Sequence, residues 1–158
     1  MAKSTFVYVT YIRTTPEKLW SALTDAEFIK QYWFGCECIC QWKKGSPWKL
    51  VSPEGKTLDD GEILEVDPPR RLVIRWQHRT KPEIAAEGES RCTMELEPNG
   101  TAVKLSIIHS VDHDPPSKFI EAVSGGWPKI MSNLKSLLET GAIAFENPYP
   151  TEAASSKE

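Results

Sequence analysis

The sequence predicts a single α+β domain in which a curved antiparallel sheet wraps around one long C-terminal helix. Strand-like segments follow one another between residues 36 and 109, separated by turns too short for crossover helices, so the strands should pair antiparallel. One further strand-like segment and two short helical segments precede this series. After it, apolar residues recur at helical spacing over about six turns. The length of 158 residues, 40% of them hydrophobic and 26% charged, suits one globular domain.

The N-terminal segment predicts one strand followed by two short helices. Residues 5–14 are β-branched and aromatic without a breaker, which is typical of a strand. A threonine N-cap followed by Pro16 is a typical helix start, because proline suits the first helical turn. Asp25 is expected to cap the second helix, and Gly35 is expected to end it.

The middle of the chain predicts six strands separated by turn residues. They cover residues 36–43, 47–51, 61–66, 71–79, 90–97 and 101–109. The sequence Pro98-Asn99-Gly100 is a hairpin signal. Apolar and charged residues alternate along these strands, so one face of the sheet should be buried and the other solvated.

The C-terminal segment predicts a long amphipathic helix. Apolar residues between positions 119 and 138 recur at helical spacing. A glycine pair and Pro128 interrupt the pattern, so a kink or break is expected near Trp127. Residues 1–145 are therefore expected to form the domain, and residues 146–158, rich in Pro, Ala and Ser, a flexible tail.

Charge and composition argue against several classes of function. The net charge is −3 and there is no basic block, so nucleic acid binding is not expected. No apolar stretch approaches the roughly 18–20 residues of a membrane span. The N-terminus has no signal-peptide core, so we expect a cytoplasmic protein without membrane insertion.

The four cysteines do not predict a metal site. Cys36, Cys38 and Cys40 alternate as in a strand, where residues on one face lie about 6.5 Å apart, too far for three thiolates on one zinc ion. No nearby histidine completes a known ligand spacing. We therefore expect no metal and no cofactor, and reduced cysteines that act as small apolar side chains.

Several segments, taken in order, resemble a known family. They are residues 16–25, Trp33, residues 61–76, the Gly100-Thr101 hairpin and the helical positions that begin at Gly126. This ordered set resembles the activator-of-heat-shock-protein-90-ATPase-like (AHSA-type) branch of the START-like, birch-pollen-allergen-like superfamily, also called SRPBCC. The resemblance implies a helix-grip fold, which agrees with the packing argument above. Residues 43–47 depart from the family's usual Arg-x-Gly-Gly-like turn.

A sheet that grips a helix encloses a cavity, and apolar walls with a few polar groups suit a small hydrophobic or aromatic ligand. The inward positions of the strands and helices are predicted to line it: Trp33, Trp76, His78, Cys92, Met94, Leu105, Ile107, His109, Trp127, Ile130 and Leu134. The same positions also fit a packed core without a pocket.

The six tryptophans divide into three groups by their expected positions. Trp33, Trp76 and Trp127 are candidates for the pocket. Trp20 is expected to lie in the core. The other two, Trp42 and Trp48, flank the turn where the family resemblance is weakest.

Two histidines are candidate polar groups at the cavity mouth. His78 and His109 each end the inward-facing positions of a strand, although a structural strand-end histidine explains them as well. His113 lies in a polar loop and should be solvated. The acidic cluster at residues 59–62 is expected to be a turn and strand start rather than an acid–base pair. The basic residues within 70–81 are expected to be a solvated face, with a docking patch for an acidic partner as the alternative.

Three functions from different classes remain open. The preferred one is a binding protein for a small hydrophobic ligand. The second, implied by the resemblance, is a stress-response module that stimulates or docks to a chaperone of the heat-shock-protein-90 class. It ranks lower because the chaperone-activating branch carries a second, N-terminal domain, whereas this chain begins its strand at Thr5. The third is a cyclase- or aromatase-like enzyme, which would require His78 and His109 to converge on one point of the pocket. An enzyme is not favoured.

Overall fold

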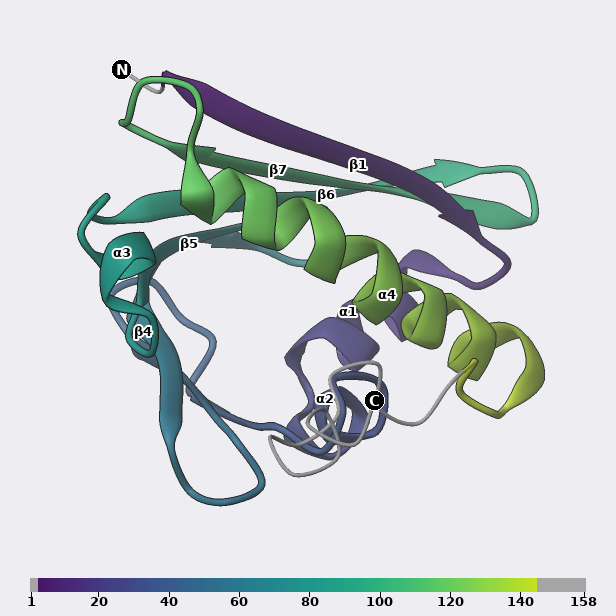
Figure 1. The fold of residues 1–158 in the computed structure, drawn as a ribbon. Helices are drawn as coiled ribbons and strands as arrows, with labels where there is room; N and C mark the ends of the chain where they lie inside the picture. Colours follow the sequence, from purple (N-terminus) through teal and green to yellow (C-terminus); the bar gives the residue numbers. More distant parts are fainter. Residues whose placement is uncertain (1–2, 145–158) are drawn as a thin grey trace.

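Seven strands form one antiparallel sheet that curves around the C-terminal helix (Figure 1). The computed structural model describes residues 3–144. The strand order is β1-β7-β6-β5-β4-β3-β2, so β1 (Ser4–Ile12) and β2 (Glu37–Cys40) are the two edges. Helix α4 (Lys118–Thr140) crosses the concave face of the sheet. The predicted α+β helix-grip architecture is confirmed.

The five inner strands lie close to their predicted positions, and the clearest differences are in β4 (Thr57–Asp67) and in the edge strand β2. The inner strands are β3 (Pro47–Val51), β4, β5 (Arg71–His78), β6 (Ser90–Asn99) and β7 (Ala102–Val111). Strand β4 starts at Thr57 rather than at residue 61, because Asp59 pairs with both neighbouring strands instead of turning. Strand β2 ends at Cys40 rather than at residue 43. There the backbone turns, with Trp42 at φ 56° and its N–H 3.2 Å from the Cys40 Sγ.

Two short helices close one end of the concave face (Figure 1). They are α1 (Pro16–Thr24) and α2 (Ala26–Tyr32). The Thr15 Oγ1 accepts a hydrogen bond from the Lys18 N–H at 3.2 Å, and the Asp25 Oδ1 accepts one from the Glu27 N–H at 2.9 Å. Both predicted N-caps are confirmed, since a cap side chain satisfies an N–H that the helix leaves unpaired.

A kink or break was predicted near Trp127, and the break does not occur, because helix α4 runs without interruption through Pro128. An interior proline removes only one hydrogen bond of the helix ladder. A continuous stripe of buried side chains faces the sheet on both sides of it, from Phe119 through Trp127 to Leu134. Burial of this stripe holds the two halves of the helix against one surface.

A further short helix, α3 (Pro82–Ala85), lies within the predicted loop between β5 and β6. The loop is fastened to the start of α4 by Glu87, whose carboxylate accepts hydrogen bonds from the Ser117 Oγ at 2.6 Å and the Lys118 N–H at 2.7 Å. Burial alone would raise the pKa of Glu87, but these bonds and one from the Phe119 N–H outweigh it and lower the pKa. Glu87 therefore anchors α3 beside the N-terminus of α4.

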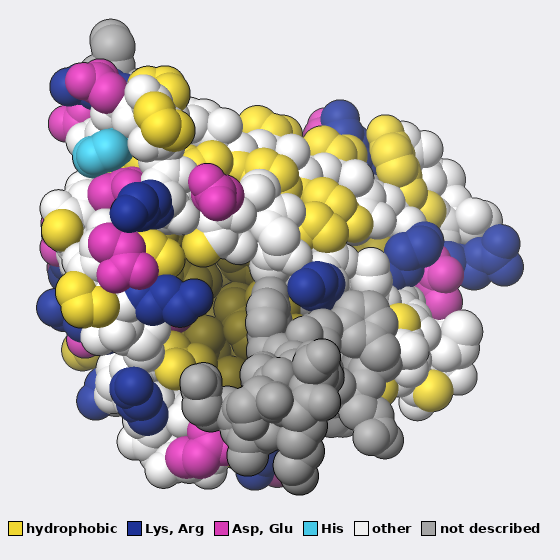
Figure 2. All heavy atoms as spheres, viewed as in Figure 1, with side chains coloured by type: hydrophobic (Ala, Val, Ile, Leu, Met, Phe, Trp, Pro, Cys, Tyr) yellow, Lys and Arg dark blue, Asp and Glu magenta, His cyan; other side chains and the backbone are white. Residues whose placement is uncertain are grey.

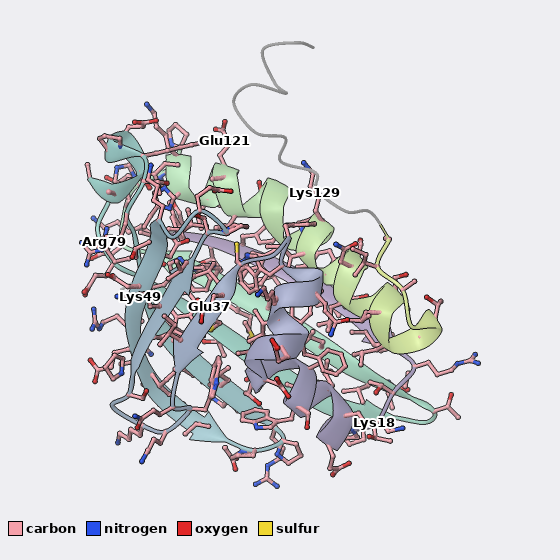
Figure 3. All side chains as sticks on the ribbon, turned by 90° about the horizontal axis from the view of Figure 1, so that it is seen from below. Lys18, Glu37, Lys49, Arg79, Glu121 and Lys129 are labelled. Atoms are coloured by element: carbon pink, nitrogen blue, oxygen red, sulfur yellow. The ribbon has the colours of Figure 1, made fainter. Side chains whose placement is uncertain are left out.

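The two faces of the sheet differ in chemistry as predicted. Along β5, Leu72, Ile74 and Trp76 point inward and are buried. Charged side chains at the rim of the sheet, such as Lys49 and Arg79, point away from the core (Figure 3). No helix within residues 3–144 is both long and apolar enough to cross a membrane. The expected flexible tail at 146–158 lies outside the described residues.

Candidate functional site

A pocket of about 400 Å³ opens between the sheet and α4, beside α3. Figure 2 shows this face of the molecule, with hydrophobic side chains inside a hollow and Lys and Arg side chains around it. Of the predicted lining residues, five lie on its wall: Trp33, Trp76, His78, Trp127 and Ile130. The other six residues predicted to line a cavity are not on the wall of this pocket.

The remaining predicted lining residues lie deeper. Five of them are 0% exposed and belong to the packed core rather than to the wall of this pocket: Cys92, Leu105, Ile107, His109 and Leu134. Met94 lines a separate void of only about 20 Å³, which Trp33 and Trp76 also line. The two tryptophans thus separate this void from the open pocket. On the far side of them, side chains fill the space that the sequence predicted to be a cavity.

Four tryptophans form the partition. The ring centroids of Trp48 and Trp76 lie 4.4 Å apart, and those of Trp33 and Trp127 lie 5.4 Å apart. Trp76 is also 5.9 Å from Trp127, so sheet and helix meet through aromatic rings. Trp48 was not predicted to take part, because it flanks the irregular turn before β3.

Gly61 explains why Trp48 reaches Trp76 across an intervening strand. In the sheet register, Trp48 pairs with Gly61 and Gly61 pairs with Trp76. Glycine leaves the inner face between the two rings open. A Cβ built on Gly61 would lie 1.6 Å from the Arg75 carbonyl oxygen, so no larger residue fits without moving the backbone.

Asp59 and His78 form the polar part of the pocket wall. The Asp59 Oδ1 lies 3.0 Å from the Trp76 Nε1 and 3.0 Å from the His78 Nδ1. The His78 Nε2 lies 2.9 Å from the Thr80 Oγ1. Since a carboxylate only accepts hydrogen bonds, Nδ1 carries the ring proton of neutral His78, and Nε2 accepts from the Thr80 hydroxyl. All four residues line the pocket.

Asp59 corrects the prediction that residues 59–62 form a turn and strand start. The side chain is buried on the inner face, with 9% of the residue exposed. Its cross-strand neighbours are Leu50 and His78. Extending the strand backward from Gly61 would have found it, because positions 59 and 61 share a face.

His109 does not reach the pocket. Its Nδ1 accepts a hydrogen bond from the Trp127 Nε1–H at 3.0 Å, so the proton of the neutral ring lies on Nε2, which donates to the Ser90 Oγ at 3.0 Å. Complete burial lowers the pKa of His109 to about 3. His109 is therefore a neutral core residue at physiological pH, and the convergence of His78 and His109 required for the enzyme hypothesis does not occur.

The thiols of Cys36 and Cys38 are weak acids that stay protonated at neutral pH. Burial, together with the Asp59 and Glu54 carboxylates, raises the pKa of Cys36 to about 11. Burial is also the main cause that raises the pKa of Cys38 to about 12. Both remain protonated at neutral pH and pack as small apolar groups. Within residues 3–144, no group of three or more His, Cys, Asp or Glu side chains is placed to hold a metal ion.

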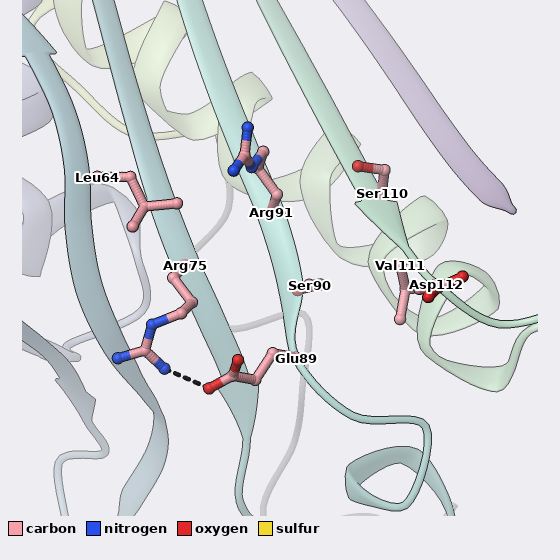
Figure 4. A pocket seen from close by; sticks show the side chains of 8 residues that line it. All are labelled: Leu64, Arg75, Glu89, Ser90, Arg91, Ser110, Val111 and Asp112. Carbon is pink, nitrogen blue, oxygen red and sulfur yellow. Dashed lines mark hydrogen bonds and ion pairs between the residues drawn. The ribbon is translucent and has the colours of Figure 1, made fainter. Parts of the chain in front are cut away.

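A second hollow, of about 490 Å³, lies on the outer face of the sheet. Figure 4 shows its wall, where Arg75 forms an ion pair with Glu89, and where Arg91 and Asp112 add one charge of each sign. The charges on this wall balance, and it lacks the aromatic side chains of the wall on the concave side.

The basic run over residues 70–81 is largely neutralised by acidic neighbours. Arg70 pairs with Asp67 at 3.2 Å, and Arg79 pairs with Asp60 at 2.8 Å. Arg71 pairs with Glu65 at 3.1 Å. This pattern is that of a solvated charged face, which the sequence predicted, and it does not favour the acidic-partner alternative.

Residues 13–139 match the model of the family described as Activator of Hsp90 ATPase homolog 1-like protein. No curated protein matches the chain. Among solved structures, protein MLL2253 from Mesorhizobium loti is 26% identical, with a TM-score of 0.75 over 86% of this chain and 97% of that one.

Two other solved structures share the fold at lower identity. An HSP90 activator from Plasmodium falciparum is 23% identical, with a TM-score of 0.70 over 85% of this chain and 95% of that one. DynU16, a protein of the dynemicin biosynthetic locus, is 20% identical, with a TM-score of 0.73 over 90% of this chain and 50% of that one.

Proposed function

The chain belongs to the Activator of Hsp90 ATPase homolog 1-like family, and from the pocket between its sheet and α4 we propose that it binds a small hydrophobic or aromatic molecule. The observation that carries this proposal is the pocket of about 400 Å³ beside the partition of tryptophans. This volume lies in the range of pockets that hold small organic ligands, about 300–1,000 Å³.

The composition of the wall supports the same proposal. Trp33, Trp76 and Trp127 offer flat aromatic surface, and Ile130 adds aliphatic surface. Such surface stabilises an apolar ligand by removing its area from water, by about 25 cal/mol per Å². The polar groups are few and gather at Asp59, as expected of a site that orients a largely apolar ligand.

A substitution that fills the pocket tests the proposal. Ala122 lines the pocket from the exposed side of α4, so Ala122→Trp should occupy it while leaving the core intact. The preceding residue, Glu121, is exposed and not part of the wall, so Glu121→Trp is the matched control. The probe is 2-naphthol, a planar molecule that fits the volume.

Saturating 2-naphthol should raise the melting temperature of the wild type and of Glu121→Trp by about 5 °C or more, and should not change that of Ala122→Trp. Native mass spectrometry of the protein purified from its host should also show bound mass that Ala122→Trp lacks. No thermal shift with 2-naphthol, together with no bound mass, would refute the proposal.

The second candidate function is docking to a chaperone of the Hsp90 class, favoured by the family match alone. The chain should then stimulate the ATPase rate of a purified Hsp90, and Ala122→Trp should stimulate it equally, because the pocket need not be involved. An unchanged ATPase rate at saturating chain would reject it. We do not propose the cyclase- or aromatase-like enzyme, since His109 lies in the core, away from the pocket.

A further inference from the structure

We propose that the pocket selects aromatic ligands that carry a hydroxyl group. The hydroxyl donates a hydrogen bond to the free carboxylate oxygen of Asp59, Oδ2. This inference rests on the proposed function, because it specifies the ligand of the same pocket.

The two ring N–H groups beside Asp59, on Trp76 and His78, are already committed to one atom, and the Trp127 indole N–H is committed to His109. The Trp76 indole N–H and the His78 Nδ1–H each lie 3.0 Å from the Asp59 Oδ1. The other ring nitrogen of His78 is taken by the Thr80 hydroxyl. A ligand carbonyl at this wall would therefore find no free N–H donor on Trp76 or His78.

The second oxygen of Asp59 is in the opposite situation. Within residues 3–144, the Oδ2 has no hydrogen-bond partner, although the residue is only 9% exposed and lines the pocket. The Oδ2 is not fully buried, so the hydroxyl of a ligand in the pocket can reach it and donate a charge-assisted hydrogen bond there. The two bonds to Oδ1 hold the carboxylate in place, so it receives the ligand without reorganising.

The surroundings of Asp59 restrict the ligand further. Trp33, Trp76 and Trp127 provide flat aromatic walls, which favour a planar ring system. A ligand carboxylate beside Asp59 would place two like charges together and is disfavoured. Exposed Lys81, also on the wall, disfavours an organic cation at the mouth. A neutral aromatic hydroxyl satisfies every one of these conditions.

Two probes that share a naphthalene ring and differ in their polar substituent test the proposal by calorimetry. 2-Naphthol offers a hydroxyl donor, and 2-acetonaphthone offers only a carbonyl acceptor. The wild type should bind 2-naphthol at least about tenfold more tightly, as expected for one buried hydrogen bond to a charged group. Asp59→Asn keeps an Oδ1 for Trp76 and His78 and replaces Oδ2 with an N–H donor, so the preference should fall to within about twofold or invert.

The neighbouring residue supplies the control. Asp60 accepts a hydrogen bond from the Arg79 Nε at 2.8 Å on the outer face, so Asp60→Asn should keep the wild-type preference. Equal binding of the two probes by the wild type would overturn this inference and leave the proposed function standing. Binding of neither probe would overturn both. If Asp59→Asn does not fold, the wild-type ratio decides the proposal on its own.

Discussion

Acidification should destabilise the protein through His109, well before most carboxylates titrate. In the folded chain the ring is completely buried, and its Nδ1 must remain unprotonated to accept the Trp127 N–H. Burial lowers the pKa of His109 from 6.5 to about 3. Between these two pKa values the unfolded chain binds a proton on His109 and the folded chain does not. Lowering the pH therefore favours unfolding.

The magnitude follows from linkage. The stabilisation is complete above the unfolded pKa of 6.5 and is lost as the pH falls toward the folded value of about 3. Below the unfolded pKa the free energy of unfolding should fall by about 1.4 kcal/mol per pH unit. From about pH 7 to pH 5, His109 alone should lower it by about 2 kcal/mol.

Urea unfolding followed by tryptophan fluorescence measures this loss directly. His109→Gln offers an amide oxygen to Trp127 and an amide N–H to Ser90 but cannot titrate. Its free energy of unfolding should therefore not show the decrease of about 2 kcal/mol between pH 7 and pH 5, within about 0.5 kcal/mol. His113→Gln is the comparison for the loss of a histidine outside the core, because 42% of the His113 side chain is exposed. A decrease of equal size in His109→Gln and the wild type would refute the reasoning.

Two further predictions concern the framework of the pocket. Gly61→Ala should destabilise the chain by about 3 kcal/mol or more, because its Cβ would lie 1.6 Å from the Arg75 carbonyl oxygen, whereas Gly125→Ala, with nothing within 4 Å, should stabilise α4 by up to about 1 kcal/mol. Equal effects in urea unfolding would contradict this. Glu87→Gln should destabilise by about 1–2 kcal/mol at neutral pH, and Glu83→Gln, on the exposed side of α3, by almost nothing. Because the pKa of Glu87 is lowered, its stabilisation is present above the unfolded pKa of about 4.5 and should vanish as the pH falls below it. A difference from the wild type that persists in acid would show that the charge is not the cause.

The fold could be predicted because its signals are local. The N-caps at Thr15 and Asp25 act within one helical turn, and the alternation along β5 decides which face is buried. The break at Pro128 was predicted from an equally local signal and did not occur. There the apolar stripe of α4, which gains its stability only from contact with the sheet, outweighs the local preference.

The polar group of the pocket could not be predicted in the same way. Asp59-Asp60-Gly61 has the composition of a turn, and nothing nearby in the sequence shows that β3 and β5 pair with it on either side. The partner of His78, Asp59, was not predicted because it lies in another strand. Cross-strand register joins residues that are distant in sequence, and one sequence contains no direct record of it.

The same register also decides which histidine faces the pocket. By leaving room between Trp48 and Trp76, Gly61 lets the rings close over the centre of the sheet, where Trp33 and Trp127 complete the partition. The core beyond the partition is filled, so the open volume lies on the side of α3, at the ends of β4 and β5. His78 and Asp59 lie on that side, and His109 lies behind Trp127 with both ring nitrogens bonded. His78 and His109 both occupy inward-facing strand positions, yet only His78 lies on the pocket wall. Aromatic packing determines where the pocket ends, and the alternation of residues along a strand contains no information about that packing.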